Sequence, residues 1–121
     1  MTRLTLDARI ARHCEHAMAS DRLDEELGTL HGIAWTQFVL LHLLDDAGGG
    51  MPMSDIAACL GLSRSRLVFQ LLPLEKLGLV RREVGQGGRS ERRIALGAAA
   101  HRLVHEARET ASAVCMAMDP A

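Results

Sequence analysis

Arginine and serine side chains gather at the start of one predicted helix, at Ser63, Arg64, Ser65 and Arg66. Arginine presents a planar fork of N–H donors that matches phosphate oxygens or the O6 and N7 edge of guanine. The N-terminus of a helix also favours phosphate, because its free N–H groups and its dipole attract negative charge. These residue types at this place predict a site for a partner that carries phosphates and bases.

A second group of arginines flanks a glycine-rich turn. Gly85-Gln86-Gly87-Gly88 separates two strand patterns, Leu79 to Val84 and Arg92 to Leu96, which predicts a β-hairpin with a glycine-rich tip. Such a ribbon can lie close to a phosphate backbone. The candidate binding residues of this segment are Arg89, Ser90, Arg92 and Arg93.

The charge distribution supports a partner of this kind. The net charge is −1, yet residues 61–96 hold eight Lys or Arg against three Asp or Glu. Residues 1–60 hold only four Arg against nine Asp or Glu. A local basic face is the electrostatic sign of a phosphate-backbone partner, even in a nearly neutral protein.

Two short helices are predicted in front of the hairpin, and together they would position the first arginine group. Ser54 is the expected N-cap of one helix, Gly61 its C-terminal stop, and Ser63 the N-cap of the next. In the second helix Leu67, Leu71, Leu74 and Leu77 or Leu79 are expected to form an inward stripe. Helix, tight turn, helix and two-stranded ribbon make up a winged helix-turn-helix, whose second helix enters the DNA major groove.

Three further helices are predicted around this motif, at about residues 4–20, 35–46 and 98–118. A short strand is expected at Met51 to Met53. In the first of these helices, Leu6, Ile10 and Met18 recur at helical spacing, which predicts an amphipathic helix. The fold class is therefore mainly α with a small β-wing, in one domain over residues 1–121.

Composition excludes several other classes. Only three aromatic residues are present, Trp35, Phe38 and Phe69, which argues against the base-stacking platforms of single-stranded nucleic-acid binders. Cys14, Cys59 and Cys115 do not form a disulfide framework, and Cys14 is expected to be a small buried side chain. No signal peptide or membrane-spanning run is found, so a soluble cytoplasmic protein is expected. No catalytic constellation or cofactor site is found.

Four segments resemble the MarR-type transcriptional regulators: IAWTQFVLLHLL from Ile33 to Leu44, Met53 to Ser63, LVFQLLPLEKLGLV from Leu67 to Val80, and the wing. The resemblance covers about residues 30 to 105. It implies a homodimer, usually a repressor, that binds a pseudo-palindromic operator and in many members is released by a small phenolic ligand. Dimerisation would use residues 1–33 and 97–121, and DNA binding residues 34–96.

Three positions depart from the family pattern. Val68 and Phe69 stand where members often carry Thr-Arg, and Phe69 is expected on the outward face of its helix with Ser65. Gly88-Arg89-Ser90 aligns with the Asp-x-Arg of the wing, without its Asp. Pro73 lies inside the recognition helix and predicts a kink or a break there.

Histidines raise alternatives to simple DNA binding. His31, Trp35, Phe38 and His42 lie where the family places an effector pocket, although an ordinary core is the competing interpretation. A metal or redox sensor would draw on Cys14 and on the first and last helices, but no segment gives a full ligand set and no metal is assigned. Its candidate ligands are His13, His16, His101 and His105.

The leading hypothesis is a homodimeric regulator that binds double-stranded DNA and no membrane. The principal alternative keeps the winged-helix fold but uses it for protein association, with the face around Phe69 and Leu72 as the contact. The predicted DNA-binding residues are Ser63, Arg64, Ser65, Arg66, Phe69, Gln70, Arg89, Ser90, Arg92 and Arg93.

Overall fold

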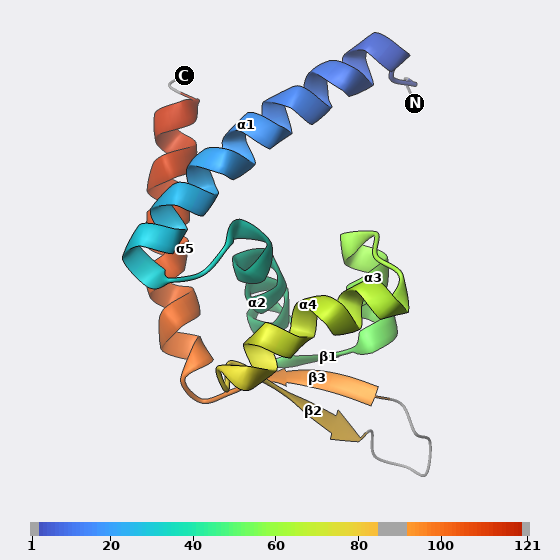
Figure 1. The fold of residues 1–121 in the computed structure, drawn as a ribbon, viewed down its shortest axis with the longest axis vertical. Coiled ribbons are helices and arrows are strands. Elements are labelled where there is room, and N and C mark those ends of the chain that lie inside the picture. The colour runs from blue at the N-terminus through green and yellow to red at the C-terminus, as the bar shows by residue number, and fades with distance from the viewer. Residues whose placement is uncertain (1–2, 85–91, 120–121) are drawn as a thin grey trace. The chain divides into compact units, whose positions relative to one another are not determined.

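The computed structural model describes residues 3–84 and 92–119. The chain, whose elements are drawn in Figure 1, divides into two compact units. Met1–Trp35 with Ala107–Ala121 forms the first, here called the terminal unit, and Thr36–Glu106 forms the second, the wing unit. The single-domain organisation over residues 1–121 stays a prediction.

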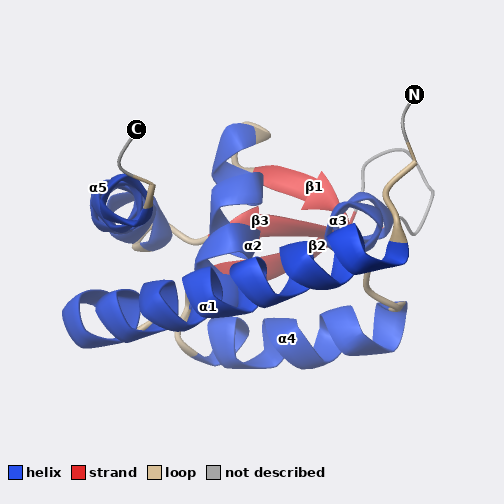
Figure 2. Ribbon diagram, turned by 90° about the horizontal axis from the view of Figure 1, so that it is seen from above, coloured by secondary structure: helices blue, strands red, loops and turns tan. Residues whose placement is uncertain are grey.

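Three short strands form the antiparallel sheet of the wing unit, in the order β1-β3-β2 (Figure 2). They are β1 (Gly50–Pro52), β2 (Val80–Val84) and β3 (Arg92–Leu96). The predicted hairpin is confirmed, since Val80 faces Leu96 and Val84 faces Arg92 across β2 and β3. Sequence reasoning found the short β1 but not its partner, which is β3, with Met51 opposite Ile94.

A leucine-rich core holds the helices of the wing unit. The helices are α2 (Trp35–Asp46), α3 (Met53–Leu60), α4 (Arg64–Lys76) and the first part of α5 (Ala100–Met118). Burial of aliphatic side chains is the main force that stabilises such a unit. The largest fully buried side chains of the unit are Leu40, Leu41, Leu44, Ile56, Leu67, Leu71, Leu74, Ile94 and Val104.

The turn between α3 and α4 follows the predicted capping pattern at two of three positions. Gly61 ends α3 with a left-handed φ of 64°, which glycine adopts without a Cβ penalty. Ser63 caps α4, and its side-chain oxygen accepts a 3.2 Å hydrogen bond from the backbone N–H of Arg66. The Ser54 cap is wrong: α3 already begins at Met53, after Pro52, so Ser54 lies within the first turn.

Pro73 does not break the recognition helix. α4 runs without interruption from Arg64 to Lys76 with Pro73 inside it. Proline removes the N–H that would otherwise bond to the carbonyl of Phe69. Both residues are exposed, so water can reach this side of the helix, and the helix continues until the backbone N–H of Leu77 bonds to the carbonyl of Pro73 at 3.1 Å.

The terminal unit contains α1 (Leu6–His31) and the last part of α5. α1 is longer than predicted, because the acidic stretch Asp21 to Glu26 extends it and Gly32, with a φ of 70°, ends it. A hydrogen bond of 2.7 Å between His31 Nε2 and Thr110 Oγ1 joins the two helices.

The apolar residues of α1 differ in burial between its first and second halves. Leu6, Ile10 and Met18 are 74%, 51% and 71% exposed, whereas Leu23 and Leu27, farther along α1, are buried. The apolar spacing is therefore present, but among the described residues the side chains of its first half are exposed.

The predicted fold class is confirmed: the chain is mainly helical, with a small antiparallel sheet that forms a winged helix. No single helix among the described residues is both long and apolar enough to cross a membrane, and α1 and α2 reach that length and composition only as a pair across their break.

Candidate nucleic-acid interface

The N-terminal turn of α4 presents the arginines that sequence reasoning singled out. Arg64, Ser65 and Arg66 are exposed, and Leu67, directly after them, is fully buried. The buried leucine fixes which way the helix faces, while the Ser63 cap fixes where it begins. The turn therefore holds two guanidinium groups at an exposed helix N-terminus, where both the groups and the helix dipole attract phosphate.

A shallow hollow continues this surface along α4. Ser65, Arg66, Phe69 and Gln70 line it, with a volume of about 460 Å³. Phe69 is 77% exposed and shares the hollow with Ser65, as its helical position predicts. Four of the predicted binding residues are thus brought together on one side of α4.

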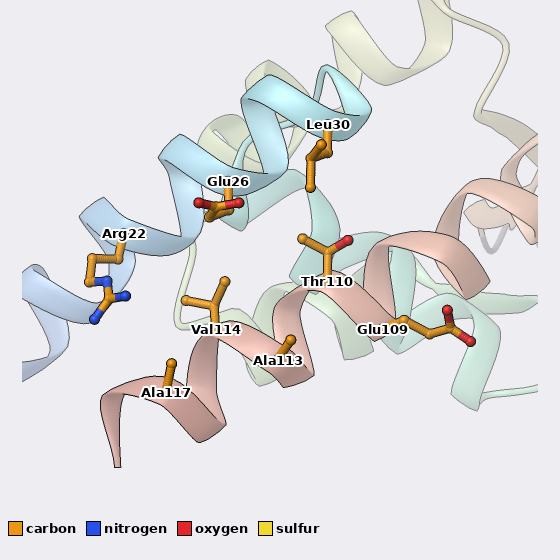
Figure 3. A pocket seen from close by; sticks show the side chains of 8 residues that line it. All are labelled: Arg22, Glu26, Leu30, Glu109, Thr110, Ala113, Val114 and Ala117. Atoms are coloured by element: carbon orange, nitrogen blue, oxygen red, sulfur yellow. The ribbon is translucent and has the colours of Figure 1, made fainter. Parts of the chain in front are cut away.

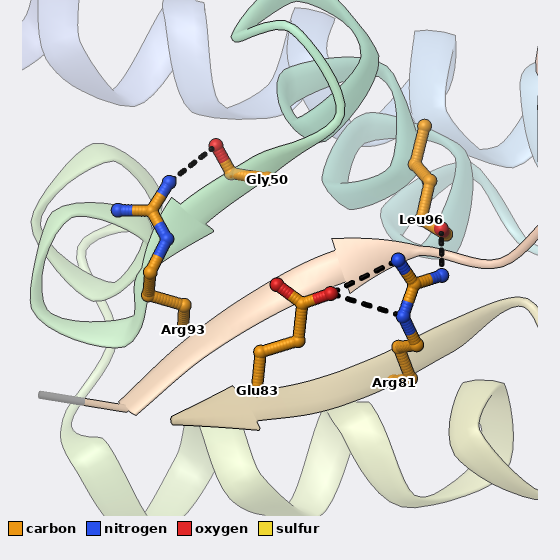
Figure 4. A network of polar contacts seen from close by, with 5 residues as sticks. All are labelled: Gly50, Arg81, Glu83, Arg93 and Leu96. Carbon is orange, nitrogen blue, oxygen red and sulfur yellow. Dashed lines mark hydrogen bonds and ion pairs between the residues drawn. The ribbon is translucent and has the colours of Figure 1, made fainter. Parts of the chain in front are cut away.

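The arginines of the sheet are partly engaged within the protein (Figure 4). Arg93 donates a weak 3.5 Å hydrogen bond from Nη2 to the carbonyl of Gly50, which ties β3 to β1. Arg81 donates to the carbonyl of Leu96 at 2.8 Å and pairs with Glu83 at 2.9 Å. Arg92 is exposed at the start of β3. Of the two described wing candidates, Arg92 faces solvent and Arg93 already supports the sheet.

Two arginines of β2 were not among the predicted site residues. Arg82 Nε lies 2.5 Å from Glu75 Oε1, so this ion pair connects β2 to α4. Arg81, beside it, has Glu83 as its partner. The sequence offered one signal, a glutamate at the second position after Arg81, but the pairing of Glu75 with Arg82 depends on the fold. The carboxylates of both pairs reduce the positive charge of β2.

Arg89 and Ser90, the two other candidates of the wing, lie outside the described residues, so their predicted contacts remain predictions.

The four candidate effector residues divide between the two units. In the wing unit Phe38 is buried, and its ring centroid lies 5.9 Å from that of His42. In the terminal unit His31 bonds to Thr110, and the backbone N–H of Trp35 donates a 2.7 Å hydrogen bond to Asp24 Oδ1. Sequence reasoning missed this use of Asp24, which supplies a helix-capping acceptor where Ala34 has none.

A hollow of the terminal unit was also not predicted (Figure 3). Its volume is about 480 Å³ and its lining mixes charged groups with small apolar side chains from α1 and α5. The lining residues are Arg22, Glu26, Leu30, Glu109, Thr110, Ala113, Val114 and Ala117.

Comparison with known proteins gives the relationship of the chain. The MarR family model matches residues 31–90, about half of the chain. AbsC, a MarR family transcriptional regulator from Streptomyces coelicolor, is 25% identical and superposes with a TM-score of 0.80, over 96% of this chain and 80% of AbsC. The chain belongs to the MarR family.

Two other MarR-family structures share the fold at lower identity. A mutant of MarR from E. coli, solved in complex with operator DNA, is 16% identical with a TM-score of 0.81, over 92% of this chain and 79% of the other. The organohalide-sensing regulator RdhR, solved with 2,4-dichlorophenol, is 20% identical with a TM-score of 0.77, over 95% and 69% of the two chains. No curated protein matches the chain significantly.

The metal and redox candidates of this MarR-family chain show no built site within the described residues. There, no group of three or more His, Cys, Asp or Glu side chains could hold a metal ion. His16 lies 3.4 Å from Ser20 Oγ, and His101 Nδ1 lies 3.4 Å from Asp45 Oδ1. The expected burial of Cys14 is wrong, since all three cysteines are free and exposed. Cys14 shares the exposed first half of α1, which explains its exposure.

Proposed function

We propose that the chain is a sequence-specific regulator of transcription that binds double-stranded DNA, with the N-terminal turn of α4 in the major groove. The observation that carries this proposal is the exposed pair Arg64 and Arg66 on a helix oriented by the buried Leu67. A helix of this kind reads base edges with its N-terminal side chains. Membership of the MarR family supports it, because the E. coli MarR structure contains operator DNA.

The wing is the second part of the proposed contact. Arg89 and Arg92 would bind the backbone or the minor groove, while Arg93 ties β3 to β1 through its bond to Gly50. Phosphate contacts of this kind fix the position of a protein on the duplex, and base contacts give specificity.

The active form is proposed to be a homodimer that acts as a repressor released by a small phenolic-type molecule. Exposed apolar side chains on α1 support the dimer, since Leu6, Ile10 and Met18 are uncovered in one chain. The dichlorophenol in the RdhR structure supports the ligand class. His31, Trp35, Phe38 and His42 stay the proposed effector residues.

The experiment is a titration of the protein with its own upstream DNA and with random DNA, at several salt concentrations. We expect tight binding to the upstream DNA and a linear fall of log K with log salt concentration, because phosphate contacts release counterions. Replacement of Arg64 or Arg66 by alanine should weaken binding by about tenfold. Arg102→Ala is the control, because Arg102 is an exposed arginine of α5 that pairs with Glu106 at 3.0 Å.

Absence of DNA binding even at low salt would refute the proposal.

One observation favours the alternative of a protein-association module: Phe69 and Leu72, both on α4, are 77% and 43% exposed. In that case α4 would bind a protein, and the two arginine variants would leave DNA binding as weak as it was.

A further inference from the structure

Phe69 is the aromatic side chain that the fold leaves in water. The sequence contains three aromatic residues, all among the described residues: Phe38 is buried, Trp35 is half-buried and Phe69 is 77% exposed. Packing within the chain does not account for this ring, because the same helix buries Leu67 and Leu71 on its other side. An exposed phenyl ring beside arginines is suited to a partner that presents an apolar group among polar or negatively charged ones.

The residues around Phe69 indicate which kind of partner would contact its ring. Ser65, Arg66 and Gln70 line the hollow with it, and all three carry hydrogen-bonding groups suited to base edges. Arginine matches guanine, glutamine matches the N6 and N7 of adenine, and serine can bond to several bases. Phe69 offers no hydrogen bond, and the apolar group that a base pair presents in the major groove is the 5-methyl of thymine.

We infer that Phe69 is a specificity-determining residue that contacts the 5-methyl group of one thymine in each half of the DNA site. The inference rests on the proposed function, because it requires α4 to lie in the major groove. A protein partner fits the hollow less well, since three of its four lining residues are polar and Leu72 is not among them.

The test removes the methyl group alone. A DNA site is first selected from a random duplex pool, and each thymine of one half-site is then replaced by uracil, which keeps the pairing and lacks the methyl. We expect one replacement to weaken binding of the unaltered protein by about fourfold, the size expected for one buried methyl group. The other replacements should have little effect.

Protein variants then connect that thymine to Phe69. Phe69→Ala should bind the thymine and uracil duplexes equally, whereas Phe69→Leu should keep part of the difference, because it retains an apolar contact. Leu77→Ala is the matched control, because Leu77 is 63% exposed but does not line the hollow. The effect of each uracil replacement on this variant should equal its effect on the unaltered protein. Because Phe69 is exposed, its replacement should leave the circular dichroism spectrum unchanged.

The outcomes separate this inference from the proposed function. If the unaltered protein selects and binds a DNA site but no uracil replacement matters, the inference is overturned and the proposed function stands. The same holds if Phe69→Ala keeps the full uracil profile, and a protein contact through Phe69 then becomes the better account. If no duplex is selected at all, the proposed function fails and the inference fails with it.

Discussion

At the scale of single residues, the arginines of the wing unit differ in what their guanidinium groups already bind. Arg64 and Arg66 are exposed at the start of α4, whereas Arg81 and Arg82 pair with glutamates and Arg93 donates to the carbonyl of Gly50. Arginine has five N–H donors, so an arginine with one internal partner keeps others for a ligand. The first pair is therefore suited to reading DNA, and the others hold the wing in shape as well as carrying charge.

Among the described glycines, Gly97 is the one at which an added methyl group meets the nearest atom. A Cβ there would lie 2.2 Å from the carbonyl oxygen of Gly78, and the N–H of Gly97 bonds to the carbonyl of Leu79 at 2.8 Å. The backbone would have to move, so Gly97→Ala should lower the free energy of unfolding by about 1–3 kcal/mol. Urea denaturation followed by circular dichroism measures the change.

Gly28→Ala is the matched control for this prediction. Gly28 lies within α1, and a Cβ there would meet no atom within 4 Å. Alanine favours the helix and restricts the unfolded chain, so this variant should be more stable by about 0.4–1 kcal/mol. Equal stability of the Gly97 and Gly28 variants would show that the close approach at Gly78 is not a constraint.

At the scale of elements, two serines near helix starts test which residue caps α4. Both were predicted as N-caps, but only Ser63 is one. Ser63→Ala removes the side-chain oxygen that accepts from the N–H of Arg66, which should cost about 1 kcal/mol of stability. Ser54→Ala changes a residue already inside α3 and should alter stability by less than about 0.5 kcal/mol. Thermal unfolding of both variants gives the comparison, and a larger loss for Ser54→Ala would contradict the observed cap.

Local signals in the sequence were sufficient for most elements of the wing unit. Turn glycines and apolar spacing placed α4, β2 and β3 to within about two residues, because these signals act over only a few residues. The sequence predicts the start of α3 too late, because the N-cap residue is Pro52, whose backbone is extended, and not Ser54. The predicted break of α4 at Pro73 is wrong, because the helix runs unbroken from Arg64 to Lys76 and the packing of Leu71 and Leu74 favours its continuation. The alternative, a kink at Pro73, stays a prediction.

The candidate site was predictable where it depends on one helix and not where it depends on two elements. Helical spacing was enough to place Phe69 outward beside Ser65. The bond from Arg93 to Gly50 joins residues 43 positions apart, and the pairing of Asp24 with the N–H of Trp35 joins two helices. Such contacts follow from the tertiary fold, so periodicity and capping rules do not reveal them.

At the scale of the whole molecule, charge and apolar surface are segregated along the chain. The basic residues concentrate in 61–96, in the wing unit, whereas α1 of the terminal unit carries an exposed apolar series at helical spacing. An exposed apolar series of this kind often marks a surface that contacts another molecule. The basic segment agrees with the proposed binding of nucleic acid, and the apolar series of α1 agrees with the proposed dimer.

The dimer can be tested by placing a charge on α1. Leu6 and Ile10 are 74% and 51% exposed and lie one helical turn apart, so glutamate at either position should leave α1 helical but oppose burial of this face. Sedimentation should give about twice the chain mass of 13.2 kDa for the unaltered protein, and 13.2 kDa for Leu6→Glu with Ile10→Glu. Leu77→Glu, a charge at a 63% exposed leucine of the wing unit, should leave the mass doubled.

DNA affinity should fall with loss of the dimer, because two half-sites are then no longer bound together. A monomeric unaltered protein at micromolar concentration, or a dimer that only Leu77→Glu disrupts, would show that α1 is not the contact.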